Sequence, residues 1–430
     1  MTQSLQGSIN IGFISFRFQG TDGVSLETSK WAGVLEEMGH QCYYFSGMSD
    51  IPPDRSMVVE EAHFLETESN AYYHKFFSST KRTKEETLWI HSRRVFFKEH
   101  LYSFINKFQI NLLIPENILS FPLNIPLSMA LAEVIAETSL PTIAHHHDFT
   151  WERKSLLVNS IRDYITMAVP PRLPSVQHVV INTSASRQLA YRVGISSMMI
   201  PNVMGFENPP PRSDDYSSDL RETLGIEPDE LFILQSTRVV QRKGIEHAIE
   251  LISRLGRKAC LVISHASGDD GYEYEAKVAD FAELMGVRTI FSSDRFGVNR
   301  GTTEDGKKIY SLSDAYPHAD LVTYPSLIEG FGNAFLEALY YKKPIVLNNY
   351  TIYATDIRPK GFKVIEFDDY ITEKTIQDTR RILDDPAYQD ELCRYNYELA
   401  LHYFSYKTLR IQFQVLLANA FGNMQIQTNN

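Results

Sequence analysis

The sequence is poor in cysteine. Cys42, Cys260 and Cys393 are its three cysteines, and they lie far apart along the chain. An odd number at such spacing does not form a disulfide framework, and no pair has the short spacing of a zinc site. Free cysteines are typical of a protein in a reducing compartment. We therefore expect a cytoplasmic protein without structural disulfides.

Long apolar runs are missing as well. The most apolar region, 121–136, is interrupted by Asn124 and Glu133 and is too short to span a bilayer. The start of the chain, MTQSLQGSINIGFISF, has no positively charged segment before its apolar run, so we expect no signal peptide. No basic amphipathic helix indicates binding to a membrane surface. The sequence thus predicts no transmembrane segment.

Positive charge is in deficit, with 42 Lys and Arg residues against 53 Asp and Glu residues and a net charge of −11. A chain with this balance is not expected to bind nucleic acid, although it can hold one diphosphate in a local basic pocket. Its 430 residues are enough for two or three domains with full cores. Nothing in the composition decides between a monomer and an oligomer.

What the chain does contain is an alternation of buried strands and helices. Residues 9–16 predict a first strand, which is followed by the loop FQGTDGVS, a helix, and a second strand at 41–47. A strand, a glycine-containing loop and a helix start make up the phosphate-binding layout of a Rossmann-like half. Residues 51–110 are polar and aromatic and predict helices. The fold class is therefore α/β with parallel sheets.

The same alternation resumes after a Pro-rich, acidic segment at 208–215 that is typical of a linker. We place the domain boundary near residue 205. The first domain then covers 1–205 and the second 206–404, and both read as Rossmann-like halves.

The most informative stretch is 325–344, PSLIEGFGNAFLEALYYKKP. A buried strand precedes it and another follows it, so the pattern predicts a βαβ unit with a glycine bend at the carboxyl end of a strand. Glycines let the backbone approach a ligand, and a helix start binds phosphates or hydroxyls. Glu329 on the bend can accept hydrogen bonds from a sugar, and Glu337 on the helix can reach a ribose. Solvated glutamates are the alternative interpretation.

Two further clusters lie where strands end. Arg238, Arg242 and Lys243 follow the strand LFILQST and precede Gly244, which predicts a diphosphate clamp or, alternatively, solvated loop charges. The sequence HHHD at 145–148 ends the strand TIAH. Successive residues of a strand point to opposite faces, so the three histidines cannot all bind one ion, and we predict no metal site. Core or solvated histidines are the alternative here.

Together these features resemble the retaining glycosyltransferases of family 4. The resemblance rests on the two glutamates with seven residues between them and EGFG between flanking strands, and on Arg238 and Lys243, five positions apart before Gly244. It implies the GT-B fold, in which two Rossmann-like domains face each other. It also implies that a C-terminal helix, at about 405–425, crosses back to the first domain. The GTDG loop departs from the adjacent glycines of many members.

The resemblance also implies roles for individual residues. Arg238 and Lys243 neutralise the diphosphate that leaves, and His147 positions the sugar and the acceptor. Glu329, with the amides of Phe331 and Gly332, orients the sugar. The expected catalytic residues are His147, Glu329, Arg238 and Lys243. The expected donor-binding residues are Gly23, Arg238, Lys243, Glu329, Phe331, Gly332, Asn333 and Glu337. The expected acceptor-binding residues are Asp22, His145, Asp148 and Trp151.

The predicted activity is therefore hexosyl transfer with retention, from a nucleotide sugar of the UDP-glucose or GDP-mannose type to a small soluble acceptor. The GTDG and HHHD segments resemble members that use a sugar, a sugar phosphate or a glycosylglycerate. No covalent nucleophile, cofactor or Mg²⁺ is required by the pattern. A lipid or polysaccharide acceptor is the first alternative, and a sugar-nucleotide epimerase or a non-catalytic nucleotide-sugar-binding protein is the second.

Overall fold

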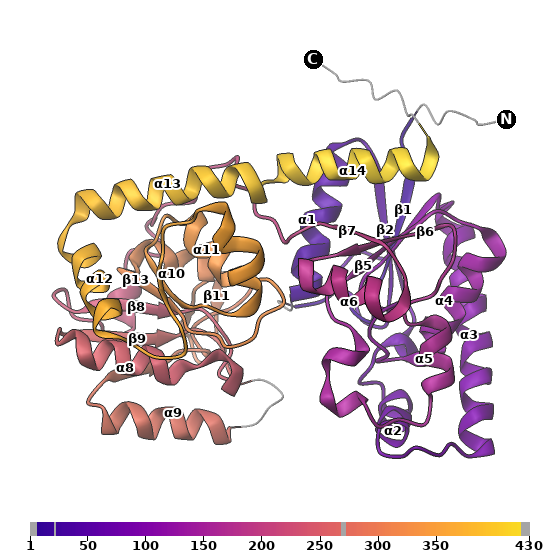
Figure 1. The fold of residues 1–430 in the computed structure, drawn as a ribbon, viewed down its shortest axis with the longest axis horizontal. Coiled ribbons are helices and arrows are strands. Elements are labelled where there is room, and N and C mark those ends of the chain that lie inside the picture. Colours follow the sequence, from indigo (N-terminus) through magenta and orange to yellow (C-terminus); the bar gives the residue numbers. More distant parts are fainter. Residues whose placement is uncertain (1–6, 21–22, 268–271, 423–430) are drawn as a thin grey trace. The chain divides into compact units, whose positions relative to one another are not determined.

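The computed structural model describes residues 7–20, 23–267 and 272–422 (Figure 1). The chain divides into two compact units. Unit 1 comprises Met1–Pro201 and Tyr406–Asn430, and unit 2 comprises Asn202–Ser405. Each unit contains one parallel sheet with helices packed against it, which confirms the predicted α/β class. Asp22, which was predicted to bind the acceptor, lies outside the described residues.

Unit 1 is built on a seven-stranded parallel sheet with the order β3-β2-β1-β4-β5-β6-β7. The chain moves outward from β1 to β3, and then returns to the other side of β1 and moves outward from β4 to β7. Sheets of this kind bind ligands at the carboxyl ends of the strands where the order reverses, which is between β1 and β4. The strands are β1 (Asn10–Ile14), β2 (Gln41–Ser46), β3 (Ser56–Val58), β4 (Leu112–Pro115), β5 (Thr142–His146), β6 (Val176–Val180) and β7 (Ser197–Met199).

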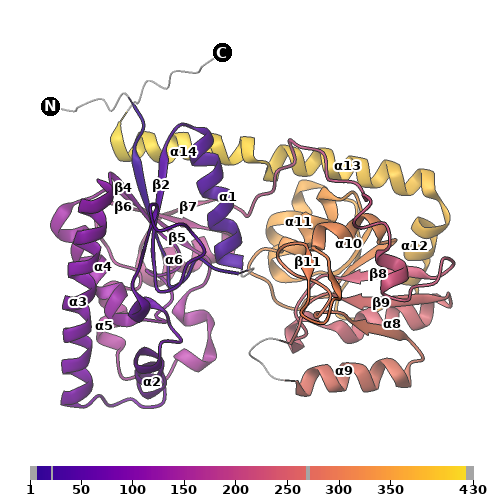
Figure 2. The ribbon, with the colours of Figure 1, turned by 180° about the vertical axis from the view of Figure 1, so that it is seen from behind.

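The helices of unit 1 cover both faces of this sheet (Figure 2). Two of them, α3 and α4, share a core with β1, β2 and β4 in which Phe97, Leu101 and Phe104 of α3 are fully buried. The helix α3 begins at a capping box formed by Thr83 and Glu86. The helices are α1 (Gly23–Glu37), α2 (Thr67–Phe76), α3 (Lys84–Phe108), α4 (Ile125–Thr138), α5 (Arg162–Ala168), α6 (Thr183–Val193) and α14 (Tyr406–Phe421).

The last helix, α14, packs on the first helix, α1. The ring of Phe413 meets the ring of Trp31 edge-on with centroids 4.9 Å apart, and both side chains are fully buried. Arg410 pairs with Glu37 at the surface, with 2.5 Å between Nη2 and Oε2. The C-terminal helix thus belongs to unit 1, as the GT-B resemblance implies.

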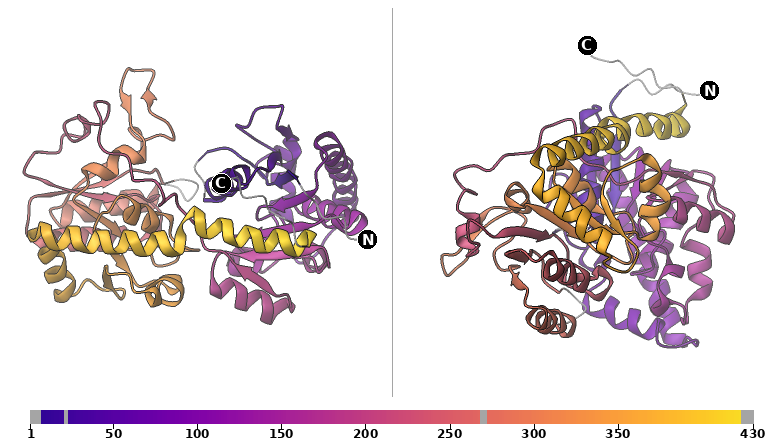
Figure 3. Two further views of the ribbon diagram at one scale, coloured as in Figure 1. Left: turned by 90° about the horizontal axis from the view of Figure 1, so that it is seen from above. Right: turned by 60° about the vertical axis from the view of Figure 1, so that its left-hand side comes forward.

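Unit 2 is built on a six-stranded parallel sheet with the order β10-β9-β8-β13-β14-β15. Its order reverses between β8 and β13, so the expected ligand edge lies at the ends of these two strands. A two-stranded ribbon, β11-β12, stands away from the sheet (Figure 3). The strands are β8 (Leu231–Gln235), β9 (Ala259–Ile263), β10 (Arg288–Phe291), β11 (Gly301–Thr302), β12 (Lys308–Ile309), β13 (Leu321–Tyr324), β14 (Ile345–Asn348) and β15 (Ile365–Phe367).

The helices of unit 2 pack on this sheet by apolar faces at helical spacing. In α8, Ile245, Ile249 and Ile252 are buried against the strands, while Arg254 on the other side is half-exposed. The helices are α7 (Leu220–Thr223), α8 (Ile245–Leu255), α9 (Glu273–Leu284), α10 (Leu312–His318), α11 (Asn333–Tyr340), α12 (Glu373–Asp384) and α13 (Pro386–Phe404). Among the described residues, no helix is long and apolar enough to cross a membrane.

One segment differs from its prediction. Residues 51–110 were expected to be helical, but they begin with the strand β3, which extends the first sheet beside β2. A strand of three residues is too short to show a period in the sequence. The rest of the segment forms α2 and α3 as expected.

A buried histidine pair joins β5 to β6 and predicts a pH-dependent stability. His146 Nε2 lies 2.9 Å from His178 Nδ1, and burial lowers the pKa of His178 to about 4 from 6.5. The folded state therefore keeps this ring neutral at a pH where the unfolded state protonates it. The free energy of unfolding should fall by roughly 3 kcal/mol as the pH drops from about 6.5 to about 4.

Urea unfolding at a series of pH values measures this effect. In His178→Gln the decline over that window should be smaller than in the wild type by about this amount, since other buried histidines with lowered pKa values still contribute to it. The exposed His74 supplies the control, since His74→Gln should keep the wild-type decline. Equal slopes for wild type and His178→Gln would contradict the prediction.

Candidate functional site

The ligand edge of unit 2 holds a buried cluster of charges. Lys243 ends the 3-10 helix η4 (Gln241–Lys243) that follows β8, and Glu329 lies in the loop after β13. The Lys243 ammonium pairs with Glu329 Oε1, and each side chain is 10% exposed. Arg242 Nη1 lies 3.4 Å from Glu329 Oε2 and donates to the Ile328 carbonyl at 3.1 Å. The ion pair thus joins β8 and β13, the two strands between which the order reverses.

The charge state of this cluster follows from its surroundings. Burial alone raises the pKa of the Glu329 carboxyl, but the charges of Lys243 and Arg242 outweigh burial and lower it. Glu329 is therefore ionised near neutral pH. A carboxylate that holds two cations in place beside a glycine bend fixes the positions from which those cations can bind an anionic ligand.

The structure separates the two cations that the resemblance singled out. Lys243 is buried in the cluster, but Arg238 is exposed, and its guanidinium forms no ion pair in the described part of the chain. Arg242, which the resemblance does not single out, contacts Glu329 instead. The turn of η4 brings Arg242 and Lys243 to the same carboxylate. The spacing of the cations along the sequence does not show which of them reach it.

Two glycines are required by the backbone around this cluster. Gly244 has φ +58°, and a Cβ atom there would lie 2.6 Å from the Pro325 carbonyl oxygen. Gly332 has φ +133°, and a Cβ atom there would lie 2.5 Å from the Tyr350 hydroxyl. That hydroxyl donates to the Phe331 carbonyl at 2.7 Å and so holds the bend at the start of α11. Both loops are therefore closed to larger residues.

The other predicted donor residues lie on or beside α11. Glu337 is half-buried, and its Oε2 accepts a hydrogen bond from the Tyr316 hydroxyl at 2.7 Å. Asn333 is the first residue of the helix, and its Oδ1 accepts from Asn202 Nδ2 at 2.8 Å. The Phe331 ring is buried against Phe404 with centroids 5.4 Å apart. Phe331 can therefore offer only its backbone to a ligand, and the predicted contact of its amide with the sugar stays a prediction.

The ligand edge of unit 1 holds a second buried cluster, at the ends of β4 and β5. Glu116 Oε2 lies 2.9 Å from His145 Nδ1 and 3.1 Å from His147 Nε2. Glu116 and His145 are fully buried, and the His147 side chain is 7% exposed. The His145 ring stacks on Trp31 of α1 with centroids 3.9 Å apart. The structure therefore brings His145 and His147 together and adds Glu116, which the sequence analysis did not select.

The three adjacent histidines separate as strand geometry requires. His146 points away from its two neighbours and bonds His178. Glu116, His145 and His147 each offer one ligand-type atom, and these atoms lie within 4.8 Å of one another, close enough to hold an ion. The predicted absence of a metal stays a prediction. Two histidines and one carboxylate are donors that suit transition metals.

The remaining predicted residues of unit 1 are not part of this cluster, and they differ in burial and in their contacts. Asp148 is partly exposed and pairs with Arg153, with 2.9 Å between Oδ1 and Nη2. Trp151 stacks on Phe149 with centroids 4.6 Å apart and belongs to a small hydrophobic cluster around α6. Its ring is thus largely used in packing. Gly23 is exposed and begins α1, which is the helix start expected after the first loop.

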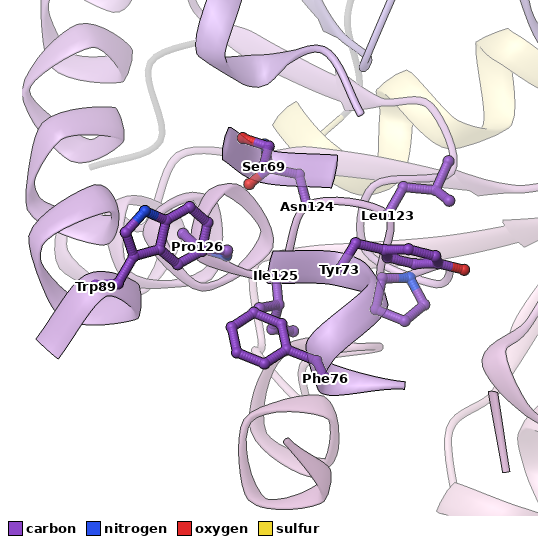
Figure 4. A pocket seen from close by; sticks show the side chains of 9 residues that line it. Ser69, Tyr73, Phe76, Trp89, Leu123, Asn124, Ile125 and Pro126 are labelled. Carbon is purple, nitrogen blue, oxygen red and sulfur yellow. The ribbon is translucent and has the colours of Figure 1, made fainter. Parts of the chain in front are cut away.

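Two surface hollows lie apart from most of these residues. In unit 1, a small pocket opens between α2, α3 and the start of α4 (Figure 4). In unit 2, a larger hollow of about 690 Å³ lies between η4 and α9 and is bordered by Arg242 and Leu327. The residues that line the unit 1 pocket are Ser69, Tyr73, Phe76, Trp89, Pro122, Leu123, Asn124, Ile125 and Pro126. Apart from Arg242, none of the site residues considered in the sequence lines either hollow.

Solved structures share this fold. Sucrose-phosphate synthase from Thermosynechococcus elongatus superimposes with a TM-score of 0.66 at 16% identity, over 96% of this chain and 99% of that one. Anabaena HepE in complex with UDP-glucose superimposes with a TM-score of 0.64 at 12% identity, over 96% of this chain and 100% of that one. These likenesses identify the fold as GT-B.

Curated sequences give a closer relationship, although no family model matches the chain. The mannosylglucosylglycerate synthase of Thermotoga maritima is 32% identical over 436 residues, which cover 93% of this chain and 98% of that protein. The mannosylglucosylglycerate synthase of Petrotoga mobilis is 30% identical over 387 residues, or 83% of this chain and 86% of that protein. With this identity over nearly its whole length, the chain is a glycosyltransferase that belongs to the mannosylglucosylglycerate synthase family.

Proposed function

We propose that this glycosyltransferase moves a hexosyl group from a nucleotide sugar to a hydroxyl of glucosylglycerate or a closely similar small acceptor. The relatives are named for a product that carries mannosyl and glucosyl groups on glycerate. A mannosyl group is therefore our first choice for the group transferred. The observation that carries the proposal in this chain is the buried Lys243–Glu329 pair with Arg242, at the ligand edge of unit 2.

The chemistry that this cluster can supply is electrostatic. When the bond between the sugar and the nucleotide breaks, negative charge grows on the diphosphate. Cations that are already in place stabilise that charge without a reorganisation cost, which is how such sites lower a barrier. Lys243 is held by Glu329 and backed by Arg242, and Arg238 is exposed on the same loop as an additional cation. We assign the neutralisation of the leaving group to these residues.

We further propose that Glu337 and the glycine bend bind the rest of the donor. The Tyr316 hydroxyl bonds one carboxylate oxygen of Glu337, which orients that carboxylate at the helix α11. A fixed carboxylate is suited to a pair of ribose hydroxyls. The backbone N–H groups at the start of α11 are suited to the transferred sugar or the phosphates. Glu329 then has two tasks, which are to hold Lys243 in place and to accept hydrogen bonds from sugar hydroxyls.

Membership of retaining family 4, and transfer with retention, are part of this proposal. They rest on the spacing of Glu329 and Glu337 across the EGFG bend. The described residues around Glu329 are cations and hydrogen-bonding groups. The only nucleophiles among these described neighbours are tyrosine and serine hydroxyls. The leaving phosphate is therefore assigned the task of assisting the incoming hydroxyl. Proton NMR of the product's anomeric signal distinguishes retention from inversion.

Thermal unfolding with nucleotides tests the proposal first. A nucleotide at 100 times its dissociation constant raises the free energy of unfolding by about 2.7 kcal/mol. For units of this size that raises the midpoint by several degrees, at roughly 2–4 °C per kcal/mol. We expect one of UDP, GDP and ADP to give this shift and its mannose or glucose conjugate to match or exceed it.

The next measurement is turnover of that conjugate with glucosylglycerate. Release of nucleotide that depends on the acceptor supports transfer, and conversion of the donor without an acceptor indicates an epimerase. A shift without turnover indicates a binding protein. Failure of all three nucleotides to raise the midpoint would contradict the proposal as a whole.

A further inference from the structure

The buried carboxylate of Glu116 has no assigned function, although it contacts the histidine that is expected to meet the substrates. It lies at the carboxyl end of β4, next to β5, where Glu116 and His145 pair across the two strands. One oxygen, Oε2, contacts His145 Nδ1 at 2.9 Å and His147 Nε2 at 3.1 Å. The other oxygen, Oε1, is buried without a hydrogen-bond partner among the described residues.

The direction of these two hydrogen bonds follows from charge. Burial by itself raises the pKa of Glu116, but the two histidines outweigh it and lower the pKa, so the carboxyl is ionised. An ionised carboxylate only accepts hydrogen bonds. Both His145 Nδ1 and His147 Nε2 must therefore carry a proton and donate it to Oε2.

The two histidines differ in the environment of the ring nitrogen that does not contact Glu116. His145 is fully buried, and its second nitrogen, Nε2, has no partner in the described part of the chain. Burial lowers its pKa more than Glu116 raises it, so this ring stays neutral. It is also clamped against Trp31 by ring stacking. His145 is thus an anchor that fixes the carboxylate, and not a residue that faces a substrate.

The His147 side chain is 7% exposed, and no described residue bonds its Nδ1. Burial lowers the pKa of this ring, but the hydrogen bond and the charge of Glu116 outweigh burial and raise it, so Nδ1 has a free lone pair only above that raised pKa. We infer that Glu116 is a positioning residue that holds His147 in the tautomer with the proton on Nε2, so that Nδ1 presents its lone pair to a hydroxyl of the substrate. The inference rests on the proposed function, because it concerns how His147 would meet the donor sugar or the acceptor. It assigns to Glu116 and His145 the task of positioning His147, whereas the resemblance implies that His145 binds the acceptor.

The ring orientation is fixed at the same time as the tautomer. The backbone N–H groups of His147 and Asp148 both donate to Asn117 Oδ1, each at 3.0 Å. Asn117 follows Glu116 directly and has φ +62°. Two successive residues at the end of β4 therefore hold the backbone and the ring of His147. A side chain held at both points loses little entropy when a substrate binds.

Nitrogen-15 NMR of histidine-labelled protein tests the inference without any turnover. The spectrum is recorded above the pH at which the ring protonates, and His147→Gln identifies the signals of His147. In the wild type we expect a protonated Nε2 and an unprotonated Nδ1. In Glu116→Met, which removes the acceptor at similar volume, the two nitrogens should move toward the average of both tautomers. A wild-type ring with its proton on Nδ1, or no change in Glu116→Met, would overturn the inference.

Kinetics supply the second readout once a donor is known. Glu116→Met should lower kcat by about 100-fold with a much smaller change in the KM of the donor, because a misplaced catalytic contact costs about that much. Glu116→Gln keeps the size and one acceptor oxygen and should retain more of the rate, which also guards against a misfolded Met variant. An unchanged kcat in both variants would contradict the inference.

Two controls separate this role of Glu116 from an effect on donor binding and from metal ligation. The nucleotide shift of the thermal midpoint should be the same in Glu116→Gln and wild type, since unit 2 carries the donor cluster. If that shift is absent in both, the proposed function fails while the NMR result still stands. Metal analysis of dialysed protein is the other control. A stoichiometric metal bound through Glu116 would overturn the inference, because a metal-bound nitrogen carries no proton.

Discussion

Replacing Lys243 with alanine should lower kcat/KM by about 100- to 1000-fold, which is the usual effect of removing one preorganised charge from a reacting centre. The same change should lower the free energy of unfolding by roughly 3–5 kcal/mol, since it leaves the Glu329 carboxylate buried beside a single, half-exposed cation. Both effects arise from one ammonium group, and they need separate measurements.

A second variant separates stability from catalysis. Lys243→Met combined with Glu329→Leu replaces the buried pair by apolar side chains, and such replacements are close to neutral or stabilising. We expect the double variant to unfold near the wild-type midpoint and still to have lost its activity. The matched control is Lys258→Ala, which breaks an exposed pair with Asp229 and should leave the midpoint nearly unchanged. Wild-type kcat/KM in the double variant would refute the assigned role of the pair.

Replacing Gly332 with alanine should destabilise the protein by roughly 2–6 kcal/mol. The residue has φ +133°, a conformation that costs a residue with a side chain about 1–3 kcal/mol. The added Cβ would also lie 2.5 Å from the Tyr350 hydroxyl, and overpacking of this kind costs about 1–3 kcal/mol more. The bend before α11 would shift, so the thermal shift caused by the donor nucleotide should shrink or vanish.

Tyr350→Phe tests the steric part of this prediction. Alone it removes the hydrogen bond to the Phe331 carbonyl, at a cost of about 1 kcal/mol. Combined with Gly332→Ala it removes the atom that the new Cβ meets, so the double variant should be less destabilised than the sum of the two single variants. Gly33→Ala in α1 is the control, since a Cβ atom there meets nothing within 4 Å. Strict additivity in urea unfolding would contradict the steric argument.

The sequence was sufficient for the fold because the relevant signals are local. Parallel strands buried on both faces appear as short apolar runs, and helices appear by their period, as in α8. Glu329 could be found for the same reason, since the glycines and the strand that place it are its neighbours along the chain. The predicted helix of that stretch is α11, which begins at Asn333 only after the bend.

Glu116 was not found, and the reason is physical. Its position at the end of a predicted strand was visible, but many residues end strands. Its significance comes from the register between β4 and β5, which brings it to His145, 29 positions further along. No local pattern encodes that pairing. A buried glutamate in the apolar run INLLIPEN is the one signal that was available, because a carboxylate at the end of a core strand needs a partner.

The contact of Arg242 with Glu329 is not visible in the sequence for a different reason. Arg242 lies four positions after Arg238, and which of the two arginines reaches Glu329 depends on where η4 begins. Helix starts are uncertain by one or two residues even in a known structure. A shift of one residue rotates each side chain by about a third of a turn in a 3-10 helix, which is enough to exchange a buried cation for an exposed one.

The return of α14 to unit 1 also bears on how the protein is made. During synthesis, residues 1–201 emerge first, but the surface of α1 that Phe413 covers stays open until α14 has left the ribosome. Unit 2 lies wholly within one continuous segment and can fold before unit 1 is complete. A chain that stops at residue 405 would retain the whole of unit 2 and leave the Trp31 face of α1 exposed to proteases and to aggregation. Nascent-chain folding would thus proceed from the middle of the sequence outward.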